Sequence, residues 1–152
     1  MEVNGGTLNL NNGAQTVDRL RGLGGTINLA DGHVLTVIQS GTGTNVSTIT
    51  GGCAIIKQGS STLGLAGDNT YTGNTTVSEG KLRVDSATAL GSTEGYTEVA
   101  GGAEVLFEGS ATTFMCNEPF RIAGTGAGDN GAIAVLSSAA PAISGLITLT
   151  GD

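Results

Sequence analysis

Residues 5–10 read Gly-Gly-Thr-Leu-Asn-Leu, and residues 24–29 repeat them as Gly-Gly-Thr-Ile-Asn-Leu, 19 positions further along the chain. Leu63 and Leu82, which open two other apolar triplets, are again 19 positions apart, whereas Leu82 and Val105 are 23 apart. The repeat is therefore close to 20 residues long, with some variation. A repeat of this length indicates a fold built from stacked structural units.

Each repeat contains an apolar-x-apolar triplet, in which alternation places two side chains on the same face of a strand. The triplets are Leu8-Asn9-Leu10, Ile27-Asn28-Leu29, Leu35-Thr36-Val37, Leu63-Gly64-Leu65, Leu82-Arg83-Val84, Val105-Leu106-Phe107, Ile133-Ala134-Val135 and Ile147-Thr148-Leu149. Leucine-rich repeats need a different leucine pattern, and propeller blades are about twice as long. We therefore expect an all-β, right-handed parallel β-helix of roughly seven coils, forming a single repeat segment over residues 1–152.

The composition supports short strands and frequent turns. The 152 residues include 27 glycines, and only 12% are charged. The sequence has no runs of helix-forming residues, which argues against a helical protein. The hydrophobic share of 38% is too high for a disordered chain. The net charge of −7 disfavours nucleic acid as a partner, and no apolar run is long enough for a membrane-spanning helix. Because no signal peptide follows Met1, we expect a segment processed or excised from a longer secreted protein.

Residues 57–84 read KQGSSTLGLAGDNTYTGNTTVSEGKLRV. This stretch resembles the autotransporter-associated β-strand repeat, or passenger-associated transport repeat, whose pattern is roughly G-x-G-x-L-x-L-x-G-x-N-T-Y-T-G-x-T-T-V-x-x-G-x-L. The matching residues are Gly59, Leu63, Leu65, Gly67, Asn69, Thr70, Tyr71, Thr72, Gly73, Thr75, Thr76, Val77, Gly80 and Leu82. Ser61 departs from the pattern, since the family often has glycine there. The match covers under a fifth of the chain, and residues 69–73 are its most specific part.

The resemblance implies a β-helical passenger that is exported across the outer membrane and displayed on the cell surface. In the family the repeat is linked to secretion and folding of the passenger, and it carries no catalytic residues. We therefore expect a non-enzymatic structural or adhesive segment without a cofactor. A host or glycan surface ligand is the partner that this implies.

The residues of the motif also suggest individual roles. We expect Leu63, Leu65, Val77, Leu82 and Val84 to point inward. Residues 67–70 are expected to form a turn in which Asn69 caps backbone amides or stacks on an equivalent residue. Tyr71 is expected to cover a corner with its hydroxyl in water, because it is bulky for a narrow core. Thr75 and Thr76 suit a strand with one wet face. Between residues 86 and 95 the pattern is lost, which predicts an irregular or short helical excursion.

The other candidate residues are interpreted as structural residues without a catalytic or metal-binding role. His33 is the only histidine, and no nucleophile motif accompanies it, so it is interpreted as a loop residue. Cys53 and Cys116 are expected to be buried free thiols, with a disulfide between adjacent coils as the alternative. The pairs Asp68-Asn69 and Asp129-Asn130 fit neither calcium-binding pattern and are read as turns.

Two further functions remain open at this point. Glu98, Glu104 and Glu108, with Glu94 nearby, are expected to face outward, and convergence of two or three of them would suit a carbohydrate-active β-helix. Open coil edges at the two ends would suit a filament subunit that stacks end to end. A solvated acidic face and a display segment are the simpler hypotheses.

Overall fold

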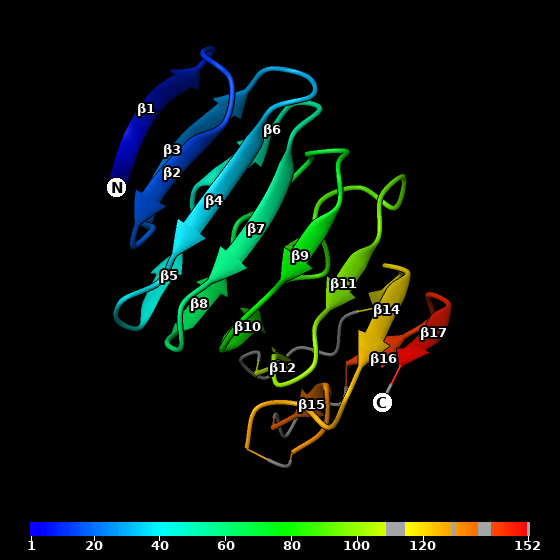
Figure 1. Cartoon of the computed structure of the whole chain (residues 1–152). Helices are drawn as coiled ribbons and strands as arrows, with labels where there is room; N and C mark the ends of the chain where they lie inside the picture. Colours follow the sequence, from blue (N-terminus) through cyan, green and yellow to red (C-terminus); the bar gives the residue numbers. More distant parts are fainter. Residues whose placement is uncertain (109–114, 129, 137–140, 152) are drawn as a thin grey trace.

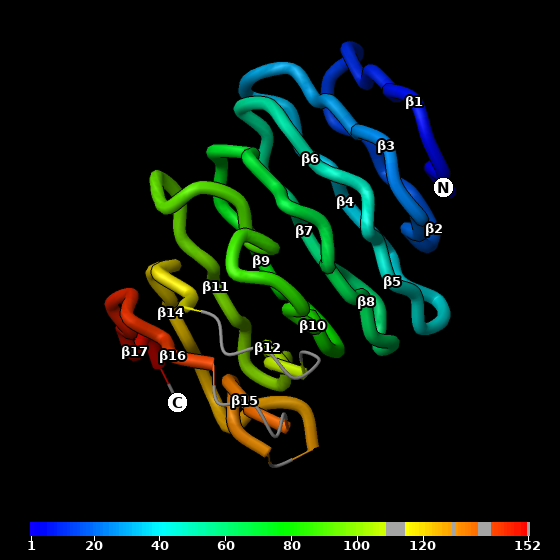
Figure 2. Tube along the Cα trace, turned by 180° about the vertical axis from the view of Figure 1, so that it is seen from behind, coloured from blue at the N-terminus to red at the C-terminus, as the bar shows by residue number. Residues whose placement is uncertain are grey.

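The computed structural model describes residues 1–108, 115–128, 130–136 and 141–151. The chain winds as a parallel β-solenoid whose two long sheets, sheet A and sheet B, face each other across the core (Figure 1). The two ends of the chain lie at opposite ends of the stack, as the view from behind also shows (Figure 2). Within the described part of the chain, no helix has the length and apolar character needed to cross a membrane.

The strands of each sheet follow one another in chain order along the stack. Sheet A consists of β1 (Glu2–Leu10), β3 (Arg21–Leu29), β5 (Gly43–Asn45), β8 (Thr62–Leu65), β10 (Lys81–Val84), β12 (Glu104–Phe107) and β15 (Ile133–Val135), and β6 (Thr48–Thr50) also pairs with β3. Sheet B consists of β2 (Gln15–Asp18), β4 (Val34–Ile38), β7 (Ala54–Gln58), β9 (Thr75–Val77), β11 (Thr97–Val99), β14 (Phe120–Ala123) and β17 (Ile147–Gly151). A small third sheet pairs β13 (Met115–Cys116) with β16 (Ala142–Ile143).

Each coil contributes one rank of strands to both long sheets, and every pairing in them is parallel. Seven ranks in sheet B correspond to about six full turns, close to the roughly seven coils expected. The prediction of an all-β parallel β-helix is therefore confirmed.

The repeat that opens the sequence forms one such pair of ranks. In the pairing of β1 with β3, Leu8 lies opposite Ile27, and Asn9 lies opposite Asn28. Asn28 Nδ2 donates a hydrogen bond of 3.1 Å to Asn9 Oδ1, and Thr50 Oγ1 extends this polar row by donating to Asn28 Oδ1 at 3.0 Å. The repeated letters are thus side chains stacked on their equivalents one coil away.

Inward-facing side chains form continuous ladders through the core. In sheet B, Val17, Val37, Lys57, Val77 and Val99 occupy one such ladder. A second sheet-B ladder holds Leu35, Ile55, Thr75, Thr97 and Phe120, and the Phe120 ring packs edge-on against Phe107 with 6.2 Å between ring centroids. Burial of these ladders from water supplies the main stabilisation of the fold.

Three local expectations need comment. Residues 86–95 are irregular, without a helix, although Ala89 and Leu90 remain buried. In β15, Ile133 packs against the core as expected, whereas Val135, which pairs with Phe107, is 47% exposed, so the expectation is wrong for Val135. Leu149 in β17 is 78% exposed because β17 is the last strand of sheet B and pairs on one side only.

Candidate functional site

The passenger-like motif forms two adjoining ranks of the solenoid, β7 to β10. Its aliphatic residues point inward as predicted: the side chains of Leu63, Leu65, Val77, Leu82 and Val84 are completely buried. Gly67 and Gly73 allow neighbouring coils to approach closely. A Cβ atom at either position would lie 2.3 Å from a carbonyl oxygen of the preceding coil, that of Ser47 or of Cys53.

Asn69 connects three coils from the irregular segment between β8 and β9. Its side chain is only 2% exposed. Oδ1 accepts a hydrogen bond of 2.8 Å from the Ile49 amide, and Nδ2 donates one of 2.6 Å to the Ala89 carbonyl. The expectation that Asn69 caps a backbone amide is therefore confirmed, and the cap reaches a coil on each side.

The expectation for Tyr71 is wrong. The side chain is fully buried, and its hydroxyl lies 2.6 Å from Thr75 Oγ1 and not in water. Space for the ring comes from the next coil, where a Cβ atom at Gly91 would lie 3.0 Å from two ring carbons. Thr75 is also fully buried, so only Thr76 lies on the outer face of β9. Burial raises the pKa of the Tyr71 hydroxyl far above its usual range.

Sequence reasoning missed a buried acid beside this pair. Glu118 is 4% exposed, and Oε1 accepts a hydrogen bond of 2.9 Å from Thr97 Oγ1, which lies directly above Thr75 in the core ladder. Burial raises the pKa of the Glu118 carboxyl to about 7, and the Thr97 hydrogen bond opposes part of that rise. Alternation along Cys116-x-Glu118-x-Phe120 was the available signal, because both flanking residues are buried.

Lys57 was missed in the same way. It occupies an inward position between Val37 and Val77 and is completely buried. Its ammonium group reaches the corner after β7 and donates hydrogen bonds to the carbonyls of Gln58, Gly59 and Glu79 at 3.0, 2.5 and 2.8 Å. Burial lowers the pKa of Lys57 to about 8, with the nearby Glu79 carboxylate acting in the opposite direction.

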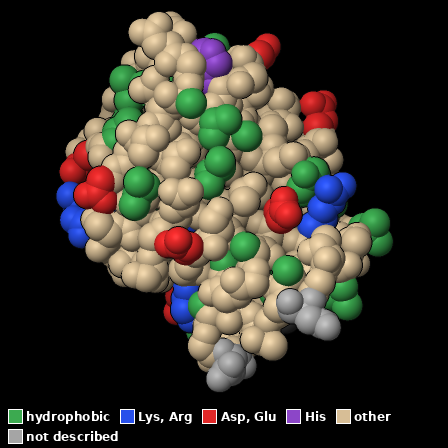
Figure 3. Space-filling model, viewed as in Figure 1, with side chains coloured by type: hydrophobic (Ala, Val, Ile, Leu, Met, Phe, Trp, Pro, Cys, Tyr) green, Lys and Arg blue, Asp and Glu red, His purple; other side chains and the backbone are tan. Residues whose placement is uncertain are grey.

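The remaining motif side chains lie at the surface. Thr70 and Thr72 are exposed, and Gly59 and Gly80 form corner turns with positive φ. Thr76 belongs to an outward ladder along sheet B that runs Thr16, Thr36, Ile56, Thr76, Glu98, Arg121 and Thr148. Figure 3 shows this face of the molecule, where the hydrophobic side chains are scattered and the acidic and basic side chains stand in a few separate groups.

The glutamates proposed as an acidic group do not converge. Glu98 lies on the outer face of sheet B, whereas Glu104 belongs to sheet A. The expectation that Glu104 faces water is wrong: it is fully buried, with Oε2 3.0 Å from Lys81 Nζ, although the geometry there is not that of a good hydrogen bond. Glu94 and Glu108 are exposed. In the described ranges, no three His, Cys, Asp or Glu side chains are grouped to hold a metal ion.

The other singled-out residues are placed as follows. Cys53 and Cys116 are both buried free thiols, so the disulfide alternative is wrong. Burial raises the pKa of Cys53 to about 11. His33 lies in the turn between β3 and β4. Asp68 is exposed and accepts a hydrogen bond from Thr88 Oγ1, whereas Asp129 lies outside the described residues.

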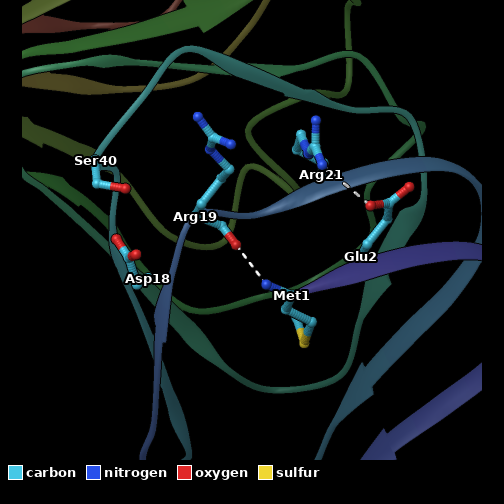
Figure 4. A pocket seen from close by; sticks show the side chains of 6 residues that line it. All are labelled: Met1, Glu2, Asp18, Arg19, Arg21 and Ser40. Carbon is cyan, nitrogen blue, oxygen red and sulfur yellow. Dashed lines mark hydrogen bonds and ion pairs between the residues drawn. The ribbon is translucent and has the colours of Figure 1, made fainter.

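A polar cavity of about 320 Å³ opens at the corner between sheet B and sheet A in the first coils. Its lining residues are Met1, Glu2, Asp18, Arg19, Arg21 and Ser40. Figure 4 shows the side chains of Arg19 and Arg21 extending to the same side of the chain. Arg21 Nη2 pairs with Glu2 Oε2 at 3.2 Å, and the Met1 amine donates to the Arg19 carbonyl at 2.6 Å.

Comparison with known proteins agrees with this architecture. Residues 55–84 match the family model of the passenger-associated-transport-repeat. The chain is also 34% identical, over 109 residues, to the adhesin BmaC autotransporter of Brucella suis biovar 1 (strain 1330). The aligned region is 70% of this chain but 3% of that much longer protein. No solved structure shows significant similarity to the chain.

Fold and motif together define a class, that of parallel β-solenoids carrying a passenger repeat. The chain is a passenger segment of the autotransporter family, and such a segment is secreted or displayed at the bacterial cell surface.

Proposed function

We propose that the chain is a non-enzymatic adhesive and display segment, one continuous domain over residues 1–152 with the motif of residues 57–84 as its structural centre. The observation that carries this function is that the motif residues serve the architecture of the solenoid. Its matching residues mainly hold ranks together through aliphatic ladders, the Asn69 cap and the Tyr71–Thr75 pair. The outer ladder of sheet B is left for contact with a partner.

The similarity to an autotransporter named as an adhesin supports the same function. A rigid rod with few charged side chains on its broad face suits contact with a host or glycan surface, because little charge must be desolvated on binding. The separation of Glu98 from Glu104 removes the arrangement that a carbohydrate-active site would need.

Adhesion of beads coated with the purified chain tests the function. We expect such beads to be retained on epithelial cells more strongly than beads coated with serum albumin. A variant with Thr36→Lys, Ile56→Lys and Thr76→Lys changes only the outer ladder of sheet B and shows whether this face makes the contact. Absence of retention on every cell type and glycan surface would overturn the adhesive function, and release of sugar from a glycan panel would overturn the non-enzymatic one.

A further inference from the structure

The corner that leads from sheet B into sheet A holds a left-handed residue in most coils. In four of them this residue is glycine: Gly59, Gly80, Gly102 and Gly124 have φ between 65° and 82°. In the first coil it is Arg19, with φ of 78°, the one non-glycine residue of the described chain with positive φ. Left-handed backbone is unfavourable for a residue with a Cβ atom. An arginine that keeps a strained backbone at a position where four other coils have glycine indicates that its side chain has a function.

The Arg19 side chain packs against Gly41 and has no counter-ion among the residues that the structure describes. A Cβ atom at Gly41 would lie 2.2 Å from Arg19 Nη2, so the guanidinium group lies across a position that only glycine leaves open. Its Nε atom is buried without a hydrogen-bond partner, and no ion pair to Arg19 is formed within the residues that the structure describes. Arg21, in contrast, is paired with Glu2.

The rest of the cavity offers the groups that bind hydroxyls. Asp18 supplies a carboxylate and Ser40 a hydroxyl on the flank next to Arg19 (Figure 4). A volume of about 320 Å³ accommodates one sugar ring, at the lower end of the range for small-molecule sites. A guanidinium group binds a carboxylate in bidentate fashion. The neighbouring carboxylate accepts hydrogen bonds from ring hydroxyls, and the serine hydroxyl both donates to them and accepts from them.

We propose that this cavity binds a terminal acidic sugar, with the sugar carboxylate on the Arg19 guanidinium and the ring hydroxyls on Asp18 and Ser40. This cavity is a separate site from the outer ladder of sheet B, and its ligand class adds a sugar contact to the adhesive function proposed above, on which it rests. A single acidic sugar is favoured over a sulfated polymer because the net charge of −7 and the carboxylates of Glu2 and Asp18 repel a polyanion.

Binding is tested on the whole chain by NMR titration with 3′-sialyllactose, with an oligosaccharide ending in glucuronic acid, and with lactose. We expect shifts of the Arg19 and Ser40 amides with one or both acidic probes and none with lactose. The two acidic probes distinguish a sialic acid from a uronic acid as the source of the carboxylate. Arg19→Gly should weaken binding at least about tenfold, the usual consequence of losing a charge-assisted pair. Arg19→Lys should give a smaller loss, since it keeps the charge without the fork.

Loss of folding does not explain such a result, because Arg19→Gly installs the residue that four other coils use and should not lower the melting temperature. Arg83→Gln, on sheet A and away from both the cavity and the outer ladder of sheet B, is the matched control and should bind like the wild type. Equal binding of lactose, unchanged binding by Arg19→Gly, or binding of heparin in place of both acidic probes would each overturn the assignment. A bead-adhesion assay run in parallel distinguishes failure of the sugar assignment from failure of the adhesive function. Adhesion without sugar binding overturns the sugar assignment and leaves the adhesive function in place.

Discussion

Replacing Asn69 by alanine should strongly destabilise the solenoid, although the substitution removes only one small side chain. The substitution removes the acceptor of the Ile49 amide and the donor to the Ala89 carbonyl, two bonds of 2.8 and 2.6 Å in a site that is 2% exposed. A buried backbone group left without a partner costs about 1–3 kcal/mol. Two such groups give an expected loss of about 2–6 kcal/mol, with the lower values if water enters the space left by the side chain.

Urea unfolding followed by far-UV circular dichroism measures the loss. Asn28→Ala is the matched control, because Asn28 also links two coils through Asn9 and Thr50 but does so at the surface. Water replaces those bonds, so the control should lose less than about 1 kcal/mol. Coils of a solenoid are coupled mainly to their neighbours, so hydrogen exchange should also show faster exchange of the Ile49 amide. A loss no greater than that of Asn28→Ala, or unchanged exchange at Ile49, would refute the reasoning.

Substitutions at three other residues test the buried polar groups. Tyr71→Phe removes the hydroxyl contact with Thr75 and should lower the unfolding free energy by about 1 kcal/mol in urea titrations, whereas Tyr71→Ala should cost about 3–5 kcal/mol. The pKa of Lys57 is lowered from 10.5 to about 8, so the unfolded chain binds more protons between these values, and the stability of the wild type relative to Lys57→Met should rise across that pH range; a constant difference would contradict this. The pKa of Glu118 is raised from 4.5 to about 7, so the stability of the wild type relative to Glu118→Gln should fall as the pH rises from 4.5 to 7, by at most about 3 kcal/mol, which thermal unfolding at several pH values would measure.

The sheets could be predicted because alternation and the 19-residue return are both properties of the sequence. The equivalence of Leu8 with Ile27, and of Leu63 with Leu82, is the register that the structure contains. Alternation also places Lys57 on the same face as Ile55, but a lysine is rarely buried, and the apolar-x-apolar pattern does not include it. The three carbonyls that satisfy it lie at the next corner and on the following coil, and the sequence does not show where they point.

Tyr71 shows the same limit, because the space for its ring does not follow from the local sequence. Its burial depends on Gly91, which lies 20 positions later and leaves the space that the ring occupies. The hydroxyl contact depends on Thr75, which faces inward on the same side of β9 as Val77. Contacts between coils decide both points, and such contacts follow from the register of the whole stack and not from the local pattern.

We infer that the buried polar groups fix which coil lies next to which. Aliphatic ladders alone specify this weakly, because a rank of leucine or valine packs on almost any other rank. Lys57, Asn69 and Glu118 differ from these residues, since each has at least one hydrogen-bond partner on a particular neighbouring coil. A slip by one coil would leave a buried ammonium, amide or carboxyl group unsatisfied, at a cost well above that of mismatched aliphatic packing. Specificity of stacking thus resides inside the rod, and the outer faces and the Arg19 corner are free to be shaped by what they bind.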